Sequence, residues 1–262
     1  MDPQERFAAR MRSVQGVQDK LVKNYGKSAL LPMTMHALDV PRLSTGVLEM
    51  DLATGGGLPK GRIIELFGPE EAGKTTTAAR AVGRAQRCCV RCGKRATFDV
   101  SGSVRIELPF GEVIEVPNHV IVDCPCGNPL QCVAAWNDIE GAFDPNWFQA
   151  NGVWLESCYL SRPTILEESI DIGQGLLESA EFNVIVYDSV AQGEPKDELE
   201  KSVADLTPGL GARLWNKATR KWQATQNAAY RKAIDTGNVE AVNMIPTVIL
   251  INQIRYKIGV MF

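Results

Sequence analysis

A lysine framed by glycines follows a short apolar run in the first third of the chain. The segment GPEEAGKTTT, residues 68–77, comes directly after RIIELF and fits the pattern G-x-x-x-x-G-K-[ST]. Glycines let backbone N–H groups turn toward phosphates, and the N-terminus of a following helix adds positive partial charge. We expect Lys74 to reach the β- and γ-phosphates and the Thr75 hydroxyl to help bind Mg²⁺. The predicted nucleotide-binding residues of this loop are Gly68, Pro69, Glu70, Glu71, Ala72, Gly73, Lys74, Thr75 and Thr76.

A carboxylate ends a second apolar run. The segment NVIVYDS reads as a buried strand that delivers Asp188 at its carboxyl end, which is where open α/β sheets place ligands. An acidic side chain there suits Mg²⁺, directly or through water. An ordinary strand-end carboxylate is the alternative. Together with the glycine-framed lysine, Asp188 predicts a chain that binds ATP with Mg²⁺.

Two short cysteine loops have the spacing of metal ligands. One is Cys-Val-Arg-Cys-Gly and the other is Cys-Pro-Cys-Gly. Thiolates two or three residues apart can surround one tetrahedral ion, and an all-sulfur site favours structural zinc. Unligated thiols are the alternative, and Cys88 could replace Cys89. The predicted zinc ligands are Cys89, Cys92, Cys124 and Cys126.

These residues require a framework of strands alternating with helices. Near-continuous apolar runs predict strands over 63–67, 132–136, 153–158, 184–187 and 247–251. Helical spacing predicts helices over 75–87, 165–179 and 210 to 233, and an N-terminal helix ending at Gly26. This alternation indicates an α/β fold, with a mainly parallel sheet covered by helices on both faces.

The cysteine loops lie in a segment that interrupts this alternation. Residues 88–130 contain the runs SVRIELPF and EVIEVPNHVIV, joined by Gly111, which predict a small β hairpin. His119 in this hairpin is interpreted as structural, and Cys132 and Cys158 as apolar residues of core strands. The predicted organisation is an N-terminal arm over 1–45 and a nucleotide-binding core over 46–262, interrupted by the insertion at 88–130. The N-terminal helix could fold back on its own domain or dock on a neighbouring subunit.

Composition limits the classes of partner. The 262 residues are 45% hydrophobic and 23% charged, with a net charge of −3. No overall positive field attracts DNA or an anionic membrane, so any DNA contact requires a local basic patch. We expect no membrane partner and a cytoplasmic location, because no apolar run reaches a membrane span and the N-terminus lacks a signal-peptide core. Seven cysteines in such a chain favour reduced thiols or a bound metal.

Five blocks of sequence resemble the RecA family of bacteria and phages, in that family's order. They are LSTGVLEMDLATGGGLPKGRIIELFGPEEAGKTT, NDIEGAFDP, VIVYDSVA, PGLGARLWNKATRKW and LINQIRYKIGVMF. The last block is the most specific, whereas the lysine loop is shared by many ATPases. The resemblance covers nearly the whole chain except the cysteine insertion and a stretch near 225–244. It implies a RecA-like P-loop NTPase core, and the family's sequences continue past this point into a second DNA-binding loop.

The resemblance also implies roles for individual residues. Glu140 stands at the position of the catalytic glutamate, which activates the attacking water. Gln253 matches the glutamine that senses the γ-phosphate. Asp144 and Trp147 match adenine contacts, although Trp147 could be a core residue and Phe148 competes for its role. For Glu140 a solvated loop carboxylate is the alternative, and for Gln253 a buried amide between strands.

The DNA contacts implied by the resemblance are basic residues. Arg213, Lys217 and Arg220 have the spacing of one helix face, and Arg213, Arg220 and Arg255 match arginines along the family's single-strand path. A solvated helix face is the alternative. The preceding loop, 194–209, corresponds to the first DNA-binding loop but is acidic here. Trp215 and Trp222 are expected on a different, buried face.

The leading hypothesis is a recombinase. It would polymerise on single-stranded DNA with ATP, pair that strand with homologous duplex DNA, and hydrolyse ATP in a DNA-dependent manner. The resemblance implies a homo-oligomer, a helical filament or a ring, with the N-terminal arm on the next subunit. The alternatives are a RecA-fold motor of helicase type and a nucleotide-switched DNA-binding scaffold with little turnover. Glu70 and Glu71 bring negative charge to the phosphate loop and predict weaker nucleotide affinity.

Overall fold

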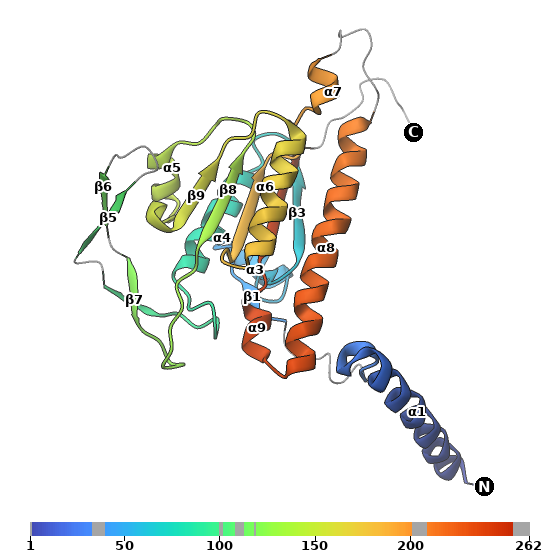
Figure 1. Ribbon diagram of the computed structural model, residues 1–262. Coiled ribbons are helices and arrows are strands. Elements are labelled where there is room, and N and C mark those ends of the chain that lie inside the picture. Colours follow the sequence, from blue (N-terminus) through green and yellow to red (C-terminus); the bar gives the residue numbers. More distant parts are fainter. Residues whose placement is uncertain are drawn as a thin grey trace.

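A five-stranded parallel sheet forms the centre of the protein (Figure 1). The computed structural model describes residues 2–32, 40–99, 102–107, 113–117, 119–200 and 209–253. The strand order is β3-β11-β10-β8-β9, and every neighbouring pair is parallel. The strands are β3 (Ile63–Gly68), β8 (Ala134–Asp138), β9 (Cys158–Ser161), β10 (Val184–Asp188) and β11 (Thr247–Gln253).

Helices cover both faces of this sheet. On one face, α4 (Lys74–Gln86) contributes Ala78 and Val82 to a core that includes Trp136 and Ile249. On the other face, α6 (Leu166–Ser179) and α8 (Leu210–Thr236) bury Leu177, Ala218 and Trp222 against Tyr187 and Val248. Successive strand residues therefore pack on opposite helical layers, which explains why the strands read as continuous apolar runs. The predicted α/β class is confirmed.

Shorter elements complete the α/β frame. A two-stranded antiparallel sheet pairs β1 (Arg42–Leu43) with β2 (Leu58–Pro59). The short helices are α3 (Leu48–Ala53), α5 (Pro145–Ala150), α7 (Lys196–Leu199) and α9 (Val239–Asn243), and two 3₁₀ turns are η1 (Lys27–Ala29) and η2 (Leu155–Ser157).

The strand predicted over 153–158 is wrong. Residues 155–157 form the turn η2, and the strand β9 begins only at Cys158. The reason is local hydrogen bonding: the buried amide of Gln86 donates to the Trp154 carbonyl at 2.7 Å and accepts from the Trp154 N–H at 2.8 Å. A side chain thus satisfies backbone groups that a neighbouring strand would otherwise bind. The strand predicted over 132–136 likewise begins two residues later, at Ala134.

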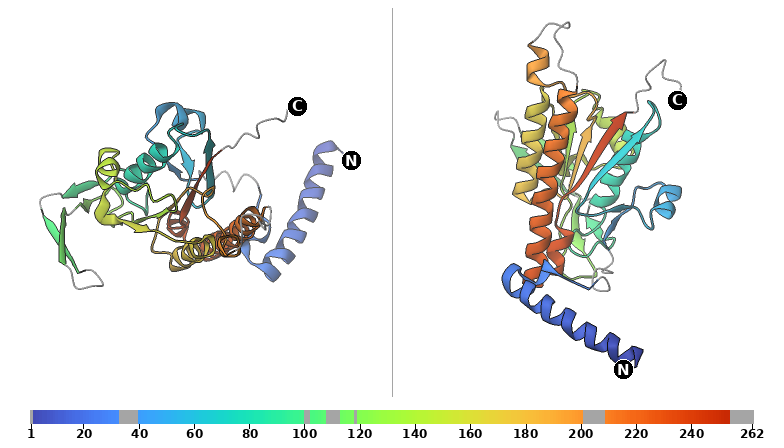
Figure 2. Two further views of the ribbon diagram at one scale, coloured as in Figure 1. Left: turned by 90° about the horizontal axis from the view of Figure 1, so that it is seen from above. Right: turned by 90° about the vertical axis from the view of Figure 1, so that its right-hand side faces the viewer.

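The N-terminal helix α1 (Pro3–Tyr25) extends away from the sheet (Figures 1 and 2). It ends at Gly26, as predicted, and none of its residues is buried. Its apolar residues Phe7, Met11, Val14 and Val17 are exposed. Next to it, Ser28 in η1 donates its backbone N–H to Asp235 of α8 at 2.8 Å. In the described residues, the apolar stripe of α1 therefore has no partner within this chain.

The cysteine insertion forms two small antiparallel sheets beside the main one. β4 (Thr97–Asp99) pairs with β7 (Val120–Asp123), and β5 (Ser103–Glu107) pairs with β6 (Val113–Pro117). The predicted hairpin corresponds to β5 and β6, while β7 returns to β4. Stacked rings join the insertion to the core: His119 lies parallel to Trp154 at 4.4 Å between ring centroids, and Phe98 meets the same ring edge-on at 4.6 Å. His119 also contacts Glu156, in agreement with its structural interpretation.

Candidate functional site

A pocket of about 250 Å³ opens at the carboxyl ends of β3, β8, β10 and β11. Parallel strands bring these ends together, so residues distant in sequence meet there. The pocket is lined by the loop residues Glu70, Glu71, Ala72, Gly73, Lys74, Thr75 and Thr76, and by Glu140, Asp188, Ile251 and Gln253. The structure thus brings the predicted phosphate loop, both predicted acidic residues and the predicted sensor glutamine into one cavity.

The phosphate loop has the expected strand–loop–helix context. Gly73 takes the left-handed conformation, with φ 78°, immediately before α4 begins at Lys74. The Lys74 ammonium donates to the carbonyls of Gly68 at 3.2 Å and Pro69 at 2.6 Å. It therefore lies across the loop, where incoming phosphate oxygens could replace these carbonyls. The side chains of Glu70 and Glu71 are at the rim and exposed to solvent.

Asp188 is buried beside α4, the helix that follows the phosphate loop. It is 7% exposed, and the Thr75 hydroxyl hydrogen-bonds to it. Burial raises the pKa of Asp188 to about 6; Glu140 and Asp138 raise it further, while Thr75 and Lys74 oppose the shift. Thr75 and Asp188, the two predicted Mg²⁺ ligands, are therefore neighbours. A divalent cation would neutralise the clustered negative charge here.

Two side chains hold Glu140 at the pocket. One carboxylate oxygen of Glu140 accepts a hydrogen bond from the Ser189 hydroxyl at 2.5 Å and another from the Gln253 amide at 2.9 Å. The Ser189 side chain is fully buried. Charged acceptors make the stronger hydrogen bonds, so these two donors fix the direction of the carboxylate. We did not predict Ser189 from the sequence, although its position directly after Asp188 was an available signal.

Asp138 is a second residue that sequence reasoning missed. Its buried carboxylate accepts from the backbone N–H groups of Ala142 at 3.0 Å and Phe143 at 3.2 Å, and Arg162 lies 3.4 Å away. These contacts close the loop that follows β8 and carries Glu140. Asp138 therefore positions the loop and does not line the pocket.

The residues predicted to contact adenine lie outside the pocket lining. Asp144 caps the N-terminus of α5, accepting from the backbone N–H groups of Asn146 at 2.9 Å and Trp147 at 3.4 Å. Trp147 is half-buried against the core. Phe148, the competing aromatic, is 2% exposed and packs edge-on against Trp136, so only Trp147 retains a free surface for a base.

The predicted DNA-binding residues occupy the outer face of α8. Arg213, Lys217 and Arg220 are all exposed. On a different face of the helix, Trp222 is fully buried and Trp215 donates its indole N–H to the Val190 carbonyl at 2.9 Å. This agrees with the predicted division of the helix. Arg255 and residues 201–208 of the predicted first DNA-binding loop lie outside the described residues.

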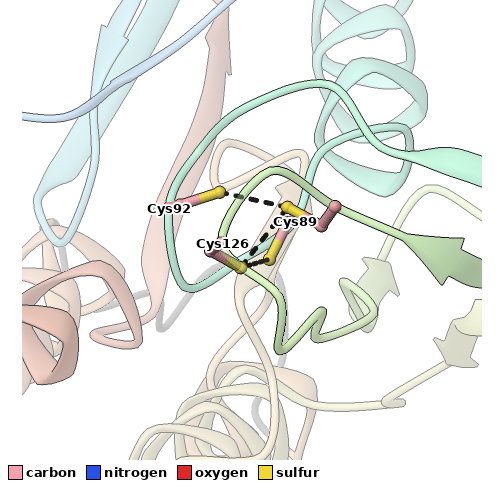
Figure 3. A group of neighbouring side chains, drawn as sticks. Cys89, Cys92 and Cys126 are labelled. Atoms are coloured by element: carbon pink, nitrogen blue, oxygen red, sulfur yellow. Dashed lines mark hydrogen bonds between the residues drawn. The ribbon is translucent and has the colours of Figure 1, made fainter.

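The four predicted cysteine ligands meet in one cluster (Figure 3). All four Sγ atoms lie within 4.8 Å of one another. The Sγ atom of Cys89 is 3.8 Å from that of Cys126. The Sγ atom of Cys124 is 3.3 Å from that of Cys92 and 3.4 Å from that of Cys126. Sulfurs around one tetrahedral zinc, bonded at about 2.3 Å, lie about 3.8 Å apart. Cys88 is not in the cluster, so the structure selects Cys89 between the two adjacent cysteines.

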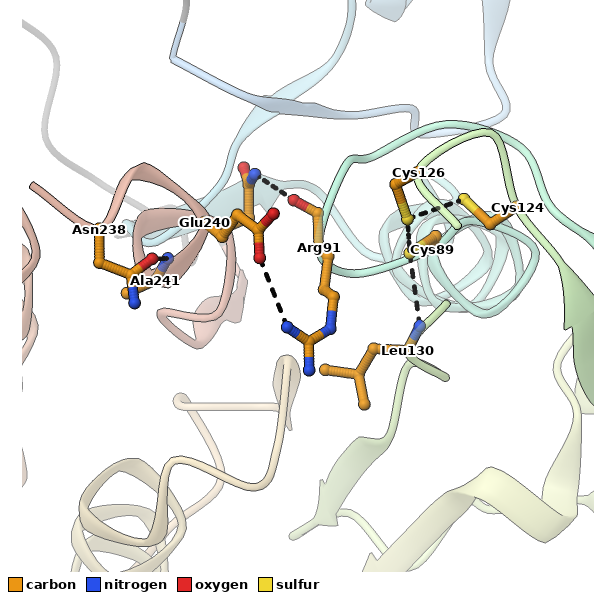
Figure 4. Close-up of polar contacts among 9 residues, drawn as sticks. Cys89, Arg91, Cys124, Cys126, Leu130, Asn238, Glu240 and Ala241 are labelled. Atoms are coloured by element: carbon orange, nitrogen blue, oxygen red, sulfur yellow. Dashed lines mark hydrogen bonds and ion pairs between the residues drawn. The ribbon is translucent and has the colours of Figure 1, made fainter. Parts of the chain in front are cut away.

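Hydrogen bonds act differently on two sulfurs of the cluster. They favour the thiolate of Cys89, whereas at Cys124 the backbone bond from Cys126 is outweighed by burial and by hydrogen bonds to the other three sulfurs, which raise the pKa to about 12. The Leu130 N–H donates to the Cys89 sulfur at 3.4 Å (Figure 4). Burial alone would raise the pKa of Cys89, but backbone N–H groups of Cys92, Leu130 and Arg91 outweigh it and lower the pKa to about 7. Arg91 also forms an ion pair with Glu240 of α9 at 3.4 Å, and its carbonyl accepts from Asn243 at 2.5 Å (Figure 4). The cluster is therefore fixed to the main domain on the α9 side.

The parallel sheet, the lysine loop and the acidic strand ends define the class of this protein as a P-loop α/β protein. A sequence model described as the RecA N-terminal domain matches residues 12–106 and 116–262. The chain therefore belongs to the RecA family. No helix of the described residues is both long and apolar enough to span a bilayer.

Several curated relatives carry the name Protein RecA. The relative from Aquifex pyrophilus is 32% identical over 260 residues, covering 98% of this chain and 58% of the relative. The relative from Aquifex aeolicus is 33% identical, covering 98% and 59%. The relative from Dichelobacter nodosus is 34% identical over 254 residues, covering 96% and 56%. The chain thus spans less than two thirds of the length of these relatives.

Proposed function

We propose that this chain is the ATPase core of a RecA-like DNA recombinase that acts in the cytoplasm. It binds single-stranded DNA with ATP as a helical assembly, pairs the strand with homologous duplex DNA, and hydrolyses ATP when DNA is bound. One observation carries this proposal: Lys74, Thr75, Asp188, Glu140 and Gln253 face a single cavity. Family membership supports the same conclusion.

Each of these side chains has a role that its position supports. The Lys74 ammonium exchanges the Gly68 and Pro69 carbonyls for phosphate oxygens. Thr75 and Asp188 would hold Mg²⁺, which would supply charge neutralisation for the transferred phosphoryl group. Glu140 orients and activates the attacking water, while the serine and the glutamine that bind its carboxylate keep it aimed at the pocket.

Gln253 provides a connection between nucleotide and DNA. It is the last residue of β11, and its amide binds Glu140 at 2.9 Å. Two positions further along the chain comes Arg255, a predicted DNA contact. When the γ-phosphate competes for the Gln253 amide, the end of β11 moves relative to Glu140. This exchange would couple cleavage of ATP to the grip on DNA.

The exposed basic face of α8 supports contact with a single strand. Arg213, Lys217 and Arg220 follow one another at helical spacing, and no described residue forms an ion pair with them. Contacts of this kind are made to phosphates, so binding would be independent of sequence and weakened by salt. The exposed apolar stripe of α1 supports the arm role, in which this N-terminal helix docks on the next subunit.

Stimulation of ATP hydrolysis by single-stranded DNA tests the proposal. We expect the purified chain to hydrolyse ATP faster with single-stranded DNA than without it. Lys74→Ala should lose nucleotide binding, whereas Glu140→Gln should keep binding and lose turnover. Equal rates with and without DNA would contradict a recombinase, and negligible turnover in both would favour the nucleotide-switched scaffold. A strand-exchange assay on the full-length protein separates recombinase from a helicase-type motor, which would unwind duplex DNA instead.

We also propose that the cysteine cluster binds one structural Zn²⁺. The donor set fits, because the four sulfurs lie within 4.8 Å of one another and hydrogen bonds from backbone N–H groups stabilise the thiolate of Cys89. Zinc would fix the two loops of the insertion and would take no part in hydrolysis. Elemental measurement of protein purified without chelator should find one zinc per chain, reduced in Cys124→Ser and unchanged in Cys132→Ser. Protein that contains no zinc after such a purification would contradict the proposal and leave the cluster as unligated thiols.

A further inference from the structure

One long stretch of this acidic protein contains basic residues but no acidic ones. Residues 72–98 contain seven lysines and arginines and no aspartate or glutamate. Lys74 belongs to the phosphate loop, and Arg91 is paired with Glu240. The other five are Arg80, Arg84, Arg87, Lys94 and Arg95, and we refer to them as the α4 basic face.

The first three members share one side of α4. Arg80, Arg84 and Arg87 are spaced by four and three residues, which places them on the same face of a helix. They line an open pocket of about 430 Å³ together with Gly46, Gly83, Ala150, Asn151 and Gly152. None of the lining residues carries a negative charge. Arg80 and Arg84 are exposed, whereas Arg87 donates to the carbonyls of Gly83 and Gly152, both at 2.6 Å.

The first cysteine loop brings the remaining two charges to the end of this helix. The Cys89 N–H donates to the Lys94 carbonyl at 2.9 Å, and the Ala96 N–H donates to the Arg87 carbonyl at 3.3 Å. The chain therefore turns back on itself, and the backbones of Cys88 and Arg95 form an isolated antiparallel β-bridge. Lys94 and Arg95 are both exposed. The cysteine cluster thus holds a basic loop against the C-terminal end of α4.

These charges have no internal counterpart in the part of the chain that the structure describes. None of the five forms an ion pair with another described residue. Three carboxylates of nearby elements have other partners: Asp51 binds Ser44 and Thr45, Glu156 binds His119, and Glu240 binds Arg91. A cluster of like charges without counter-charge raises the local potential and attracts an anionic partner.

The α4 basic face and the α8 face lie on opposite sides of the sheet. α4 packs in the core cluster on one side, and α8 packs in the cluster on the other. Figure 2 shows the two helices separated by the strands. A single strand of DNA bound along α8 does not reach the α4 basic face. A ligand on the α4 basic face would therefore be a second molecule or a second segment of the DNA.

We propose that the α4 basic face binds the phosphate backbone of duplex DNA. Arginines one helical turn apart, on a rigid element, suit repeated phosphates. The exposed phenylalanines and tyrosines of the described residues, Phe7, Tyr25, Phe67 and Tyr159, lie outside this face, so its contacts would be to phosphates and would include no base stacking. An acidic peptide would gain little, because the pocket offers no apolar anchor beyond Ala150. The proposed function requires a duplex partner, and this face would supply its site.

Anisotropy of a fluorescein-labelled duplex, measured without nucleotide, tests this site separately from ATP hydrolysis. The variant is Arg80→Ala/Arg84→Ala, in which both side chains are exposed and alanine preserves the helix. We expect its affinity for duplex DNA to fall, and the slope of log affinity against log salt to decrease by about 2, since each phosphate contact contributes about 0.9. Arg213→Ala/Arg220→Ala on α8 is the matched control, which should retain duplex binding and lose stimulation of ATP hydrolysis by single-stranded DNA.

The outcomes separate the two proposals. Wild-type affinity and salt slope for duplex DNA in Arg80→Ala/Arg84→Ala would overturn the α4 site, whether or not single-stranded DNA stimulates hydrolysis. Loss of poly-glutamate binding with duplex binding retained would also overturn it, by assigning the face to an acidic peptide. Loss of duplex binding by this variant, with normal hydrolysis on single-stranded DNA, supports it. If no DNA stimulates hydrolysis but the variant still loses duplex binding, the recombinase proposal fails and the α4 site stands.

Discussion

Asp188 carries its charge at an energetic cost that the substitution Asp188→Asn should remove. The carboxylate is 7% exposed and has Glu140 and Asp138 nearby. Asparagine has almost the same shape and can still hydrogen-bond to Thr75, but it has no charge to bury. We therefore expect Asp188→Asn to be more stable than the wild type at neutral pH when no nucleotide or metal is bound.

The size of this stability difference follows from the pKa of Asp188. The folded protein raises the pKa of Asp188 from 3.8 to about 6, so the folded state holds the proton more tightly than the unfolded state. The contribution of this group to stability is therefore favourable below the lower pKa and is lost as the pH rises through about 6. At about 1.4 kcal/mol per pKa unit, the difference of about 2 corresponds to up to about 3 kcal/mol at pH 7 and above.

Urea unfolding of both proteins between about pH 4 and pH 8 measures this difference. The free energy of unfolding of Asp188→Asn should exceed that of the wild type by about 1–3 kcal/mol at high pH, and the gap should close toward the pKa of 3.8. Asp171→Asn, at an exposed carboxylate of α6 that stays hydrated, should show no such gap. A variant that is less stable than the wild type at pH 8, or a gap independent of pH, would refute the reasoning.

Adding ATP with Mg²⁺ should make the wild type more stable to unfolding than Asp188→Asn. The ligand stabilises a protein that binds it by about 2.7 kcal/mol at a hundredfold excess over the dissociation constant. We expect the wild type to gain this stabilisation and Asp188→Asn to gain much less, because the variant has lost a metal ligand. Equal gains in both proteins would remove Asp188 from the metal site.

Two further predictions concern single side chains. Ser189→Ala should lower kcat about tenfold to a hundredfold with ATP affinity unchanged, because a hydrogen bond to the Glu140 carboxylate contributes about 1.5–3 kcal/mol. Ser189→Thr, which keeps the hydroxyl, should restore the rate. A loss of ATP affinity equal to the loss of rate would contradict a positioning role for Ser189. In α6, Gly173→Ala should destabilise the fold by about 1–3 kcal/mol, because its methyl group would overlap the Tyr187 hydroxyl. Gly175→Ala, with open space around it, should stabilise by about 0.5–1 kcal/mol in the same unfolding assay, and similar effects at both sites would contradict the packing described.

Much of the frame was predictable because local rules determine it. A parallel sheet buried on both faces needs strands with continuous apolar runs, and the runs VIVY in β10 and VILI in β11 meet this condition. The lysine loop must follow a strand and begin a helix, so β3 and α4 were defined together. Because parallel strands end at the same edge, the meeting of Asp188 with the loop followed from topology. Cysteine spacing likewise predicted a shared cluster.

Contacts between polar side chains were not predictable in the same way. Ser189 and Glu140 are 49 residues apart in the chain, and Gln86 and Trp154 are 68 apart. Such hydrogen bonds depend on where the backbone brings two elements together, and no periodic pattern encodes them. The consequence is visible at residues 155–157, where Gln86 satisfies the backbone of Trp154 and a predicted strand becomes a turn.

The insertion at residues 88–130 leaves the parallel sheet and its helices intact because the two ends of the insertion are fixed to each other. It joins α4, which begins at the phosphate loop, to β8, which leads to Glu140. The Val90 N–H donates to the Leu130 carbonyl at 2.9 Å, and the Leu130 N–H donates to the Cys89 sulfur, so the chain re-enters the domain close to where it left. When the ends of a loop are held together, further residues cost only a slowly growing loop entropy. β8 consequently keeps its register with β10, with Asp138 opposite Asp188. The cysteine cluster sits at this crossing point, so metal binding there would stabilise the path from α4 to Glu140 as well as the insertion itself.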